Sequence, residues 1–470
     1  MTTTAPPYKD WPADTSRPKT VLCHGVYDVI HLGHIRHFAE ARALGDRLVV
    51  SITADRHVRK GAGRPHFSAE QRREALLKLK DVDEVVISES GTAIETIKRL
   101  RPAVYAKGPD YADANVEELP DSFVAALKLE VEAIESVGGR FVTTTAEKWS
   151  SSKLLRSVRL PDSALVYLDS ARESGFLDKI LAAFEEADKL RIVFVGETII
   201  DEYRYVRPLA KPSKEFILAT VDAGGEDFRG GVIAASKQGE WKNKGVVTHV
   251  KSITKTRFVD ADFSRKLFEV YSAREIGDLG DVSIGMTREI EAADVVVALD
   301  FGHGFFDAQR CDLLQKAKFL ALTVQSNAGN WGFNPVSRHK RAHYIAIDEP
   351  EARLALGMQH QPIEDVAGDL WTTMGRGRAV TVTRGRYGSF SVGFGAPSAA
   401  VPAFAEAGFD TMGAGDAFIS VAAPLVASGL PVEMAAFAGN VAGGLKTSIL
   451  GHRQHITRDD VVKNIEWLLK

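Results

Sequence analysis

Residues 20–34 read TVLCHGVYDVIHLGH, and this stretch decides how the first part of the chain is organised. The apolar run at 20–23 predicts a buried strand, and residues 35–45, IRHFAEARALG, have a helical pattern that ends at a glycine. A strand that passes through a turn directly into a helix is typical of an open α/β sheet. In such sheets, ligands bind at the carboxyl ends of the strands.

The alternation of strands and helices continues after this stretch. We expect strands over 47–53, 82–87 and 103–106 and helices over 68–80 and 93–100. Ser68 is a suitable cap for the first of these helices. Elements that alternate at this spacing indicate a parallel sheet that is covered on both faces. The sequence therefore predicts a first domain over residues 18–160, preceded by a flexible tail at 1–17.

The rest of the chain repeats the α/β pattern on a larger scale. Residues 161–188 have a mostly helical pattern and predict a linker. Apolar runs follow at 191–196, 293–300, 318–324 and 379–385. Because such runs suit buried parallel strands, residues 189–470 predict one large α/β domain.

The composition is that of an ordinary globular protein. Of the 470 residues, 45% are hydrophobic and 26% are charged, and the formal net charge is −3. These values exclude a mainly disordered or disulfide-dense chain and give no reason to expect binding to nucleic acid or to a membrane. Two cysteines, the absence of a secretory signal and the absence of a run of about 18 apolar residues predict a cytoplasmic protein.

The turn after the first strand carries the first candidate site. His31 and His34 are three residues apart and face the same side of a helical turn, and Gly33 allows the backbone to approach a ligand closely. A helix N-terminus offers unpaired N–H groups to a phosphate, and the two imidazoles could hold its oxygens. Histidines that cap the helix or pack in the core are the alternative. A zinc site is a weaker one, because two ligands are too few.

The pattern G-x-x-D-x-x-H-x-G-H over 25–34 resembles the signature of the cytidylyltransferase-like nucleotidyltransferases. Residues 43–65 and 101–111 are similar to the matching stretches of bacterial heptose 1-phosphate adenylyltransferases, and the resemblance resumes at 139–156. It implies a Rossmann-like domain in which a phosphate attacks the α-phosphorus of a nucleoside triphosphate. Pyrophosphate would leave, with Mg²⁺ easing the charge on it.

The resemblance also implies roles for individual residues. The catalytic positions would be His31, His34 and Lys60. The nucleotide-binding positions would be Gly25, Asp28, Gly33, Arg72, Lys107, Gly108, Asp110, Tyr111, Ser150, Ser151 and Ser152. Three features depart from the family. The loop before Lys60 is shorter than in the heptose enzymes, an acidic segment, 112–130, is inserted after Tyr111, and three serines stand where the family has Ser-Thr-Thr.

A second candidate site lies at 409–418, which read FDTMGAGDAF. Two glycines with a small residue between them let consecutive N–H groups converge on an anion. Asp416 is then placed to accept a proton from an attacking hydroxyl. A glycine-rich loop that serves only tight packing is the alternative.

The ten residues closely resemble the second signature of the ribokinase-like (PfkB) sugar kinases, and the resemblance covers about 190–456. It implies Asp416 as the catalytic base and a ribokinase-like α/β fold. Nucleotide or anion binding would fall to Thr383, Gly385, Asp410, Thr411, Gly413, Ala414, Gly415 and Asn440. Sugar binding would fall to Asp201, Gly230 and Gly231, and a magnesium-linked motif to Asp348 and Glu351.

This half also departs from its family. Ala234 replaces the asparagine that usually follows the paired glycines, and His303 replaces a lysine. Residues 325–327 read Gln-Ser-Asn instead of Asp-Pro-Lys, which removes a phosphate-facing lysine. The resemblance therefore implies either an unusual sugar or a nucleotide-binding relic.

Three hypotheses follow. The first is a bifunctional enzyme that makes a heptose-like sugar phosphate and then a nucleotide-activated sugar from it, with the two halves in the reverse of their order in a known bifunctional heptose enzyme. The second is a nucleotidyltransferase that uses CTP and a polyol phosphate, with a kinase-like half that only binds or dimerises. The third is a non-enzymatic nucleotide sensor. The partners expected are ATP or CTP, a sugar or polyol phosphate and, by analogy with ribokinase-like domains, a second copy of the chain.

Overall fold

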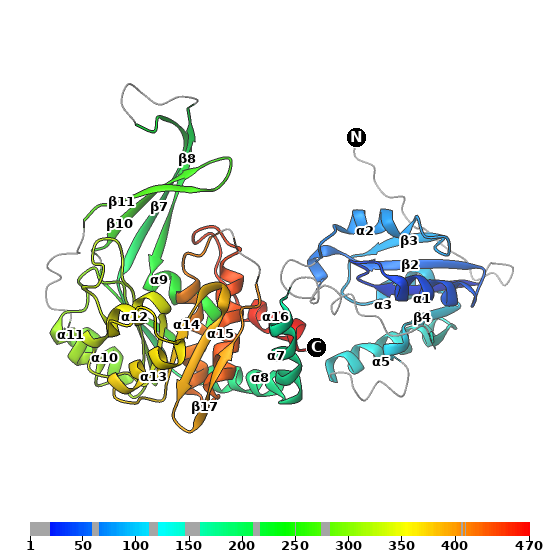
Figure 1. Ribbon diagram of the computed structural model, residues 1–470. Coiled ribbons are helices and arrows are strands. Elements are labelled where there is room, and N and C mark those ends of the chain that lie inside the picture. Colours follow the sequence, from blue (N-terminus) through cyan, green and yellow to red (C-terminus); the bar gives the residue numbers. More distant parts are fainter. Residues whose placement is uncertain are drawn as a thin grey trace. The chain divides into compact units, whose positions relative to one another are not determined.

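The chain folds into two compact units, Met1–Val158 and Arg159–Lys470, which are called the first and the second unit below (Figure 1). The computed structural model describes residues 19–58, 65–111, 121–145, 160–209, 217–249, 251–273, 283–405, 408 and 410–470. In the described residues, no helix is long and apolar enough to cross a membrane.

The first unit is built on a parallel sheet of five strands in the order β3-β2-β1-β4-β5. The strands are β1 (Thr20–Gly25), β2 (Arg47–Thr53), β3 (Glu84–Ser88), β4 (Val104–Lys107) and β5 (Arg140–Thr143). The helices are α1 (Leu32–Arg42), α2 (Ala69–Leu76), α3 (Ile94–Leu100) and α5 (Asp121–Ser136), with short 3-10 turns η1 (Asp55–His57) and η2 (Pro109–Tyr111). The predicted parallel α/β sheet is confirmed.

Alternating residues of β1 explain why both faces of this sheet are covered. Val21 and Cys23 pack with Phe38 of α1 on one face, whereas Leu22 packs with Ile97 of α3 on the other. Side chains of a strand point alternately to its two faces, so a continuous apolar run can feed two cores at once. Ser68 caps α2 through a capping box, as predicted.

The acidic segment 112–130, which we expected as an insertion, is in its second part a structural element. Residues 121–130 begin α5, and the helix packs Ala133 and Ile134 into one of the two cores. Glu130 of the same helix is buried and accepts hydrogen bonds from the N–H of Ala93 and the hydroxyl of Tyr105. The helix therefore covers one face of the sheet.

The second unit contains a sheet of eight strands in the order β17-β16-β15-β14-β13-β12-β6-β9. The strands from β9 to β15 run parallel, and β16 and β17 are antiparallel additions. They are β6 (Ile192–Gly196), β9 (Lys244–Val247), β12 (Val295–Asp300), β13 (Leu320–Val324), β14 (Tyr344–Asp348), β15 (Ala379–Thr383), β16 (Ser389–Gly393) and β17 (Ala396–Val401). The second α/β domain is thus confirmed.

Helices cover both faces of this sheet, and two of them correct an expectation. They are α7 (Asp162–Glu173), α8 (Phe176–Ala187), α9 (Val232–Ala235), α10 (Ser283–Ala292), α11 (Ala308–Leu314), α12 (Glu349–Leu356), α13 (Ile363–Thr373), α14 (Ala414–Ala427), α15 (Val432–Lys446) and α16 (Arg458–Leu469). We expected residues 161–188 to be a linker. Instead, α7 and α8 bury Leu168, Ile180 and Phe184 in the core that α14 and α15 also line. The apolar spacing that suggested helices also commits them to this core.

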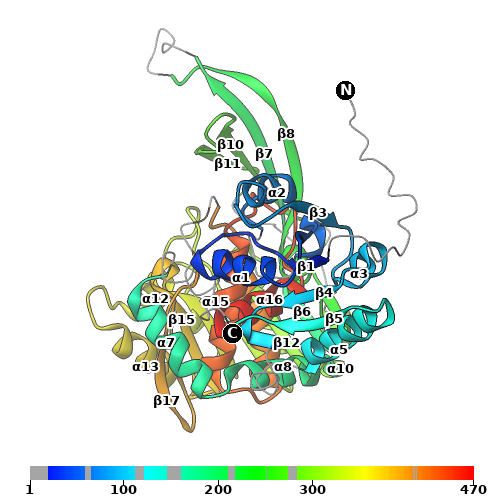
Figure 2. The ribbon, with the colours of Figure 1, turned by 90° about the vertical axis from the view of Figure 1, so that its right-hand side faces the viewer.

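A second, smaller sheet was not predicted. It has the order β11-β10-β7-β8 and consists of β7 (Thr198–Pro208), β8 (Thr220–Gly231), β10 (Ile253–Asp260) and β11 (Lys266–Tyr271). Its strands project from the body of the second unit in both views (Figures 1 and 2). Along β10 every second residue is buried, including Lys255 and Arg257. The face of this small sheet that carries them is therefore covered and charged.

Candidate functional site

The strand order of the first unit places its candidate site. The order reverses between β1 and β4, and ligands of open parallel sheets bind outside the carboxyl ends of the strands at such a point. The loop after β1 leads to the start of α1, and β4 ends at Lys107 next to the turn η2. Sequence segments 80 residues apart thereby meet at one edge of the sheet.

His31 and His34 lie together at the start of α1. Their rings stack with centroids 3.8 Å apart and an angle of 20° between the planes, and Tyr27 meets His34 edge-on at 5.2 Å. His31 occupies the N-cap position, but its side chain makes no capping hydrogen bond. Gly33 between them is buried. The paired imidazoles at a helix start therefore retain the arrangement that a phosphate would need.

Arg72 is buried and has acceptors within its own unit. Its side chain is 0% exposed, and its guanidinium donates to Asp55 Oδ1 at 2.6 Å and to the carbonyls of Thr53, Val26 and Phe67 at 2.5–3.0 Å. Since these acceptors lie at the end of β2, in the turn η1 and in two neighbouring loops, Arg72 has a structural role at the edge of the sheet. Its contact with a nucleotide stays a prediction.

Asp28 has a similar role. It is buried, and its carboxylate accepts hydrogen bonds from the backbone N–H groups of His66 and Phe67 at 2.9 and 3.0 Å. It thereby ties the loop after β1 to the segment that leads into α2. Asp28 and Arg72 thus hold the edge of the sheet together, and their contact with a nucleotide stays a prediction.

Replacement of Arg72 by Met is expected to destabilise the first unit by about 3–5 kcal/mol, because it removes a buried charge whose carboxylate and carbonyl partners stay behind. Hydrogen exchange of the β1 and β2 amides measures this. Arg73→Met is the matched control, since Arg73 is half exposed and its ion pair with Glu70 is long, at 3.5 Å. Its cost should stay below about 1 kcal/mol. Equal protection in the two variants would contradict the role given to Arg72.

Lys107 is nearly buried and is held by aromatic and acidic neighbours. Its ammonium lies 3.2 Å from Glu130, 4.6 Å from the centre of the Tyr111 ring and 5.5 Å from that of Tyr105. Burial would raise the pKa of Glu130, but the charge of Lys107 and the hydrogen bonds from Ala93 and Tyr105 together hold that pKa below its ordinary value. An added Cβ on Gly108 would meet open space. The space next to Gly108 is therefore where this motif could contact a ligand, with Tyr111 beside Lys107.

Two buried histidines near the same edge were not predicted. Nδ1 of His24 lies 3.0 Å from the hydroxyl of Ser51, and Nδ1 of His37 lies 2.8 Å from that of Thr144. Burial lowers the pKa of each to about 4. Both imidazoles are therefore neutral at physiological pH.

Several predicted residues lie outside the described part of the chain. They are Lys60, Ser150, Ser151, Ser152 and the first residue of the second motif, Phe409. Asp110 is placed in the turn η2, but its side chain is not described. Their roles stay predictions.

The second candidate site is formed at the start of α14. Gly413 is the N-cap residue with φ +75°, a conformation that L side chains rarely adopt. Asp416 lies in the first turn with 7% exposure, and Oδ1 accepts a hydrogen bond from Nε2 of Gln325 at 3.0 Å. Burial raises the pKa of Asp416 to about 6. A carboxylate with a raised pKa at a helix start suits a general base.

The remaining positions of the motif behave differently from one another. Thr411 and Gly415 are exposed, and a Cβ added to Gly415 would meet open space. Ala414 begins α14 and donates its N–H to the carbonyl of Thr411 at 3.2 Å. The start of the helix beyond Gly413 is therefore open to a ligand.

Asp410 is fully engaged with the small sheet instead of facing a ligand. Its Oδ1 accepts from Lys266 Nζ at 2.7 Å, and its Oδ2 accepts from the hydroxyl of Tyr203 at 3.2 Å and the N–H of Gly451 at 2.9 Å. Burial would raise the pKa of Asp410, but these bonds hold it below its ordinary value. The predicted anion-binding residue joins the glycine-rich loop to the small sheet.

The predicted sugar-binding residues lie on the neighbouring strands β7 and β8 of the small sheet. Asp201 forms an ion pair with Arg257, and its Oδ2 lies 3.2 Å from Nε2 of His452. A Cβ on Gly230 would overlap the Asp201 carboxylate. Gly231 has φ +61° and passes too close to the Glu197 carbonyl for a side chain. Burial would raise the pKa of Asp201, but His452 and Arg257 hold it below its ordinary value.

Three residues predicted to bind the nucleotide in the second unit are Asn440, Thr383 and Gly385, and the first of them is engaged by the protein's own backbone. Nδ2 of Asn440 donates to the carbonyls of Val401 and Pro402, both at 3.1 Å, so this amide braces the end of β17. Thr383 ends β15, with Oγ1 3.4 Å from the Ile347 carbonyl. Gly385 begins a 3-10 turn with φ +52°.

The two predicted metal ligands form a capping box at the start of α12. Asp348 accepts from the N–H of Glu349, and Glu351 accepts from the N–H groups of Asp348 and Ser326. Burial raises the pKa of Glu351 to about 7. Among the residues that the structure describes, no group of three or more His, Cys, Asp or Glu side chains could hold a metal ion.

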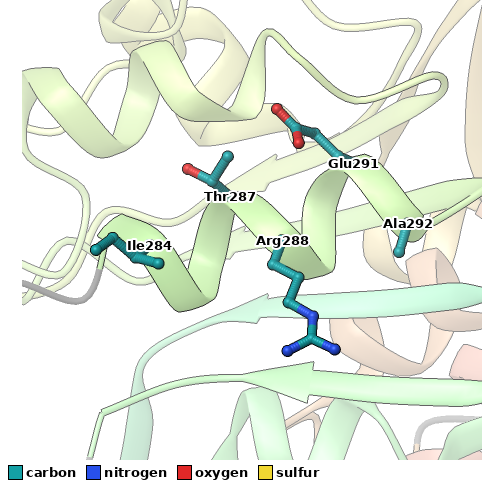
Figure 3. Close-up of a pocket in the computed structure, with 5 residues that line it drawn as sticks. All are labelled: Ile284, Thr287, Arg288, Glu291 and Ala292. Carbon is teal, nitrogen blue, oxygen red and sulfur yellow. The ribbon is translucent and has the colours of Figure 1, made fainter.

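Two hollows lie on the second unit. One of about 510 Å³ is lined by Ile284, Thr287, Arg288, Glu291 and Ala292 of α10 (Figure 3). None of the predicted site residues lines it, and we assign it no role. The other, of about 300 Å³, lies between Tyr271 and Ala273 at the end of β11 and residues 327–329. The Tyr271 ring there is 6.1 Å from that of His303.

Comparisons with known proteins agree with this geometry. Residues 22–157 match the family described as cytidylyltransferase-like. A FAD synthase of Pyrococcus abyssi (strain GE5 / Orsay) is 41% identical over 116 residues, which are 24% of this chain and 77% of that protein. The chain belongs to the cytidylyltransferase-like family. The matched residues include the strand, the histidine pair and the helix described above.

The second unit carries a domain of a second family. Residues 309–456 match the family described as pfkB family carbohydrate kinase, and they include α14 and Asp416. A solved ribokinase from Thermotoga maritima is 16% identical with a TM-score of 0.46, over 59% of this chain and 99% of that one. The predicted pair of a cytidylyltransferase-like domain and a PfkB domain is thus confirmed.

Further relatives of the cytidylyltransferase-like domain are named bifunctional protein HldE. That of Syntrophotalea carbinolica (strain DSM 2380 / NBRC 103641 / GraBd1) is 36% identical over 137 residues, 28% of this chain and 27% of the relative. The match therefore spans about a quarter of the length of these relatives.

Proposed function

We propose that this chain is a bifunctional enzyme. The PfkB domain phosphorylates a hydroxyl of a heptose-like sugar, and the cytidylyltransferase-like domain couples the resulting phosphate to a nucleotide with release of pyrophosphate. One observation carries the proposal: each unit places its own reactive side chains at a helix start, the stacked His31 and His34 in one and Asp416 in the other.

In the nucleotidyl transfer, an oxygen of the acceptor phosphate attacks the α-phosphorus of the triphosphate. The bond from that phosphorus to the leaving pyrophosphate breaks in the same step. The charge that develops on the equatorial oxygens lies at the start of α1, where N–H groups and the two imidazoles can stabilise it. No covalent intermediate with the protein is needed. Lys60 and the three serines at 150–152 would complete this site.

The family implies Mg²⁺, and the described residues fit it only in part. The oxygens of Asp348 and Glu351 accept backbone hydrogen bonds, so these two carboxylates do not make a ready site. Mg²⁺ commonly keeps its place through substrate phosphates with one or two carboxylates. We therefore expect the ion to bind together with the triphosphate.

The acceptor and the nucleotide are the parts of the proposal that need an assay first. The resemblance of residues 43–65 and 101–111 to heptose 1-phosphate adenylyltransferases favours ATP with a sugar 1-phosphate, and the FAD synthase relative adds a flavin phosphate to the acceptors that deserve a test. Pyrophosphate release should be measured with ATP and CTP separately against sugar 1-phosphates, polyol phosphates and a flavin phosphate. Release that requires one acceptor supports the proposal, whereas none with any pair would contradict it.

The pH dependence of the kinase reaction follows from Asp416. A general base works only when ionised, so kcat should fall as the pH drops below about 6, the raised pKa of this buried carboxyl. The hydrogen bond from Gln325 favours the ionised form, so Gln325→Leu should move the acid limb to higher pH. The measurement is kcat against pH for both proteins. An acid limb that stays in place would contradict the assignment of Asp416.

A second candidate function is a nucleotidyltransferase whose PfkB domain only binds a ligand. It is favoured by Asp201, whose two oxygens are taken by Arg257 and His452 rather than left for sugar hydroxyls. In that case no sugar would stimulate the conversion of ATP to ADP.

A further inference from the structure

His452 lies at the centre of the second candidate site, although no sequence motif pointed to it. It follows α15 in the chain and stands between the small sheet and the start of α14. Its Nε2 is 3.2 Å from Oδ2 of Asp201 on β7, and a Cβ built on Gly413 would lie 3.4 Å from its Cε1. The imidazole thus bridges a carboxylate and the glycine-rich loop.

The orientation of the ring leaves one nitrogen for a ligand. Cε1, the ring carbon between the two nitrogens, is the atom nearest to Gly413. The ring therefore turns the edge that carries Nδ1, Cε1 and Nε2 towards Gly413, and Nε2 lies at the Asp201 end of that edge. Nδ1, at the other end of that edge, is buried and has no hydrogen-bond partner among the described residues. A buried polar atom of this kind calls for a partner that the described residues do not supply.

The other cations near Gly413 are already engaged. Lys446 is 0% exposed and donates to the carbonyl of Gly451 at 2.5 Å. Lys266 is paired with Asp410, and Arg257 with Asp201 and Glu269. His452 Nδ1 therefore adds a donor position at this loop to those of the neighbouring lysines.

We propose that His452, as an imidazolium held by Asp201, is the cation that contacts the transferred phosphoryl group at the start of α14. Nε2–H donates to Asp201, and Nδ1–H donates to an equatorial oxygen of the phosphoryl group. The inference deepens the proposed kinase function and rests on it for the identity of the anion.

In the reaction, the acceptor oxygen forms a bond to the γ-phosphorus of ATP, and the bond from that phosphorus to the bridging oxygen of ADP breaks. The proton of the acceptor hydroxyl passes to Asp416, and His452 keeps both of its protons. Charge spreads over the equatorial oxygens in such a transition state, so a fixed cation there favours it.

Charged groups from several elements decide how this contact depends on pH. The acidic groups around it are Asp201 on β7, Asp416 on α14 and Asp410 before α14. The basic groups are Arg257 on β10, Lys266 on β11 and Lys446 on α15. An imidazolium offers two N–H donors and a neutral imidazole offers one, so we expect the anion to bind more tightly at low pH than at high pH.

Sulfate is the probe, since its charge is constant between about pH 5 and 9. Its binding can be measured without knowing the sugar that accepts the phosphoryl group. The full chain carries ¹⁵N-labelled histidines, and the His452 ring signals are those missing from His452→Gln. We expect these signals to shift on addition of sulfate, and the affinity read from them to fall at least tenfold from pH 5.5 to pH 8.5. Asp201→Asn, which keeps the ring but removes its anionic partner, should weaken sulfate binding at pH 6.

The matched control is His455→Gln, because His455 lies three residues on and faces Glu240 at the surface. It should leave the His452 response within twofold of wild type. His452 signals that ignore sulfate at every pH would overturn the inference. If sugar were phosphorylated nonetheless, the proposed function would stand without it. A response to sulfate in a chain that phosphorylates no acceptor would support the site and contradict the kinase function.

Discussion

Replacement of Asp416 by Asn is expected to lower the rate of sugar phosphorylation about 10²–10⁴-fold. The amide keeps the shape of the side chain at the start of α14 but cannot accept the proton of the attacking hydroxyl. Pyrophosphate release from a preformed sugar phosphate should be unchanged, because that reaction belongs to the first unit. Both rates are measured on the same preparation.

Asp369→Asn is the matched control for this variant. Asp369 is an exposed carboxylate on α13 of the same unit, and its loss should leave both rates within twofold of wild type. If Asp416→Asn retained most of the kinase rate, Asp416 would not be the base, and the raised pKa of its carboxyl would reflect burial alone.

Replacement of His34 by Ala is expected to lower pyrophosphate release about 10²–10³-fold, the usual effect of removing one group that stabilises developing charge. The loss should be mainly in kcat, because the imidazole acts most strongly when charge accumulates on the α-phosphate. Conversion of ATP to ADP with the unphosphorylated sugar should not change. The measurement is steady-state pyrophosphate release at varied triphosphate and acceptor.

His37→Asn is the control on the same helix. His37 lies one turn after His34, but it is buried with its Nδ1 on Thr144, and an asparagine can replace that contact. We expect its rate to stay within about threefold of wild type. A His37→Asn variant as impaired as His34→Ala would mean that α1 packing, rather than the paired imidazoles, limits the reaction.

The sequence was most informative where one local pattern decides a structure. The strand at β2 was predicted with the bounds that it has, because seven consecutive residues there suit a buried parallel strand. The Ser68 cap was likewise local. The small sheet was missed because its strands are half exposed. In β10 two of the buried positions are charged, Lys255 and Arg257, so the strand lacks the alternation of apolar and polar residues that predicts one. The role of 161–188 was misjudged because helical periodicity does not say which core a helix joins.

The site residues divide along the same line. His31, His34, Gly413 and Asp416 sit in contiguous motifs, and the structure places them at helix starts as expected. Arg72 and Asp410 were expected to face ligands, yet their partners come from loops and strands that the sequence does not bring together. His452 had no motif at all. Only the fold brings it to Asp201, which is 251 residues away in the chain.

The most direct test of the bifunctional account is a single ³¹P NMR time course of the full chain with ATP and the unphosphorylated form of whichever acceptor supports pyrophosphate release. The account predicts that ADP and a sugar phosphate form first, and that pyrophosphate and a nucleotide-activated sugar then appear as the sugar phosphate is consumed. Pyrophosphate that forms only from added sugar phosphate, with no ADP from the free sugar, would contradict it.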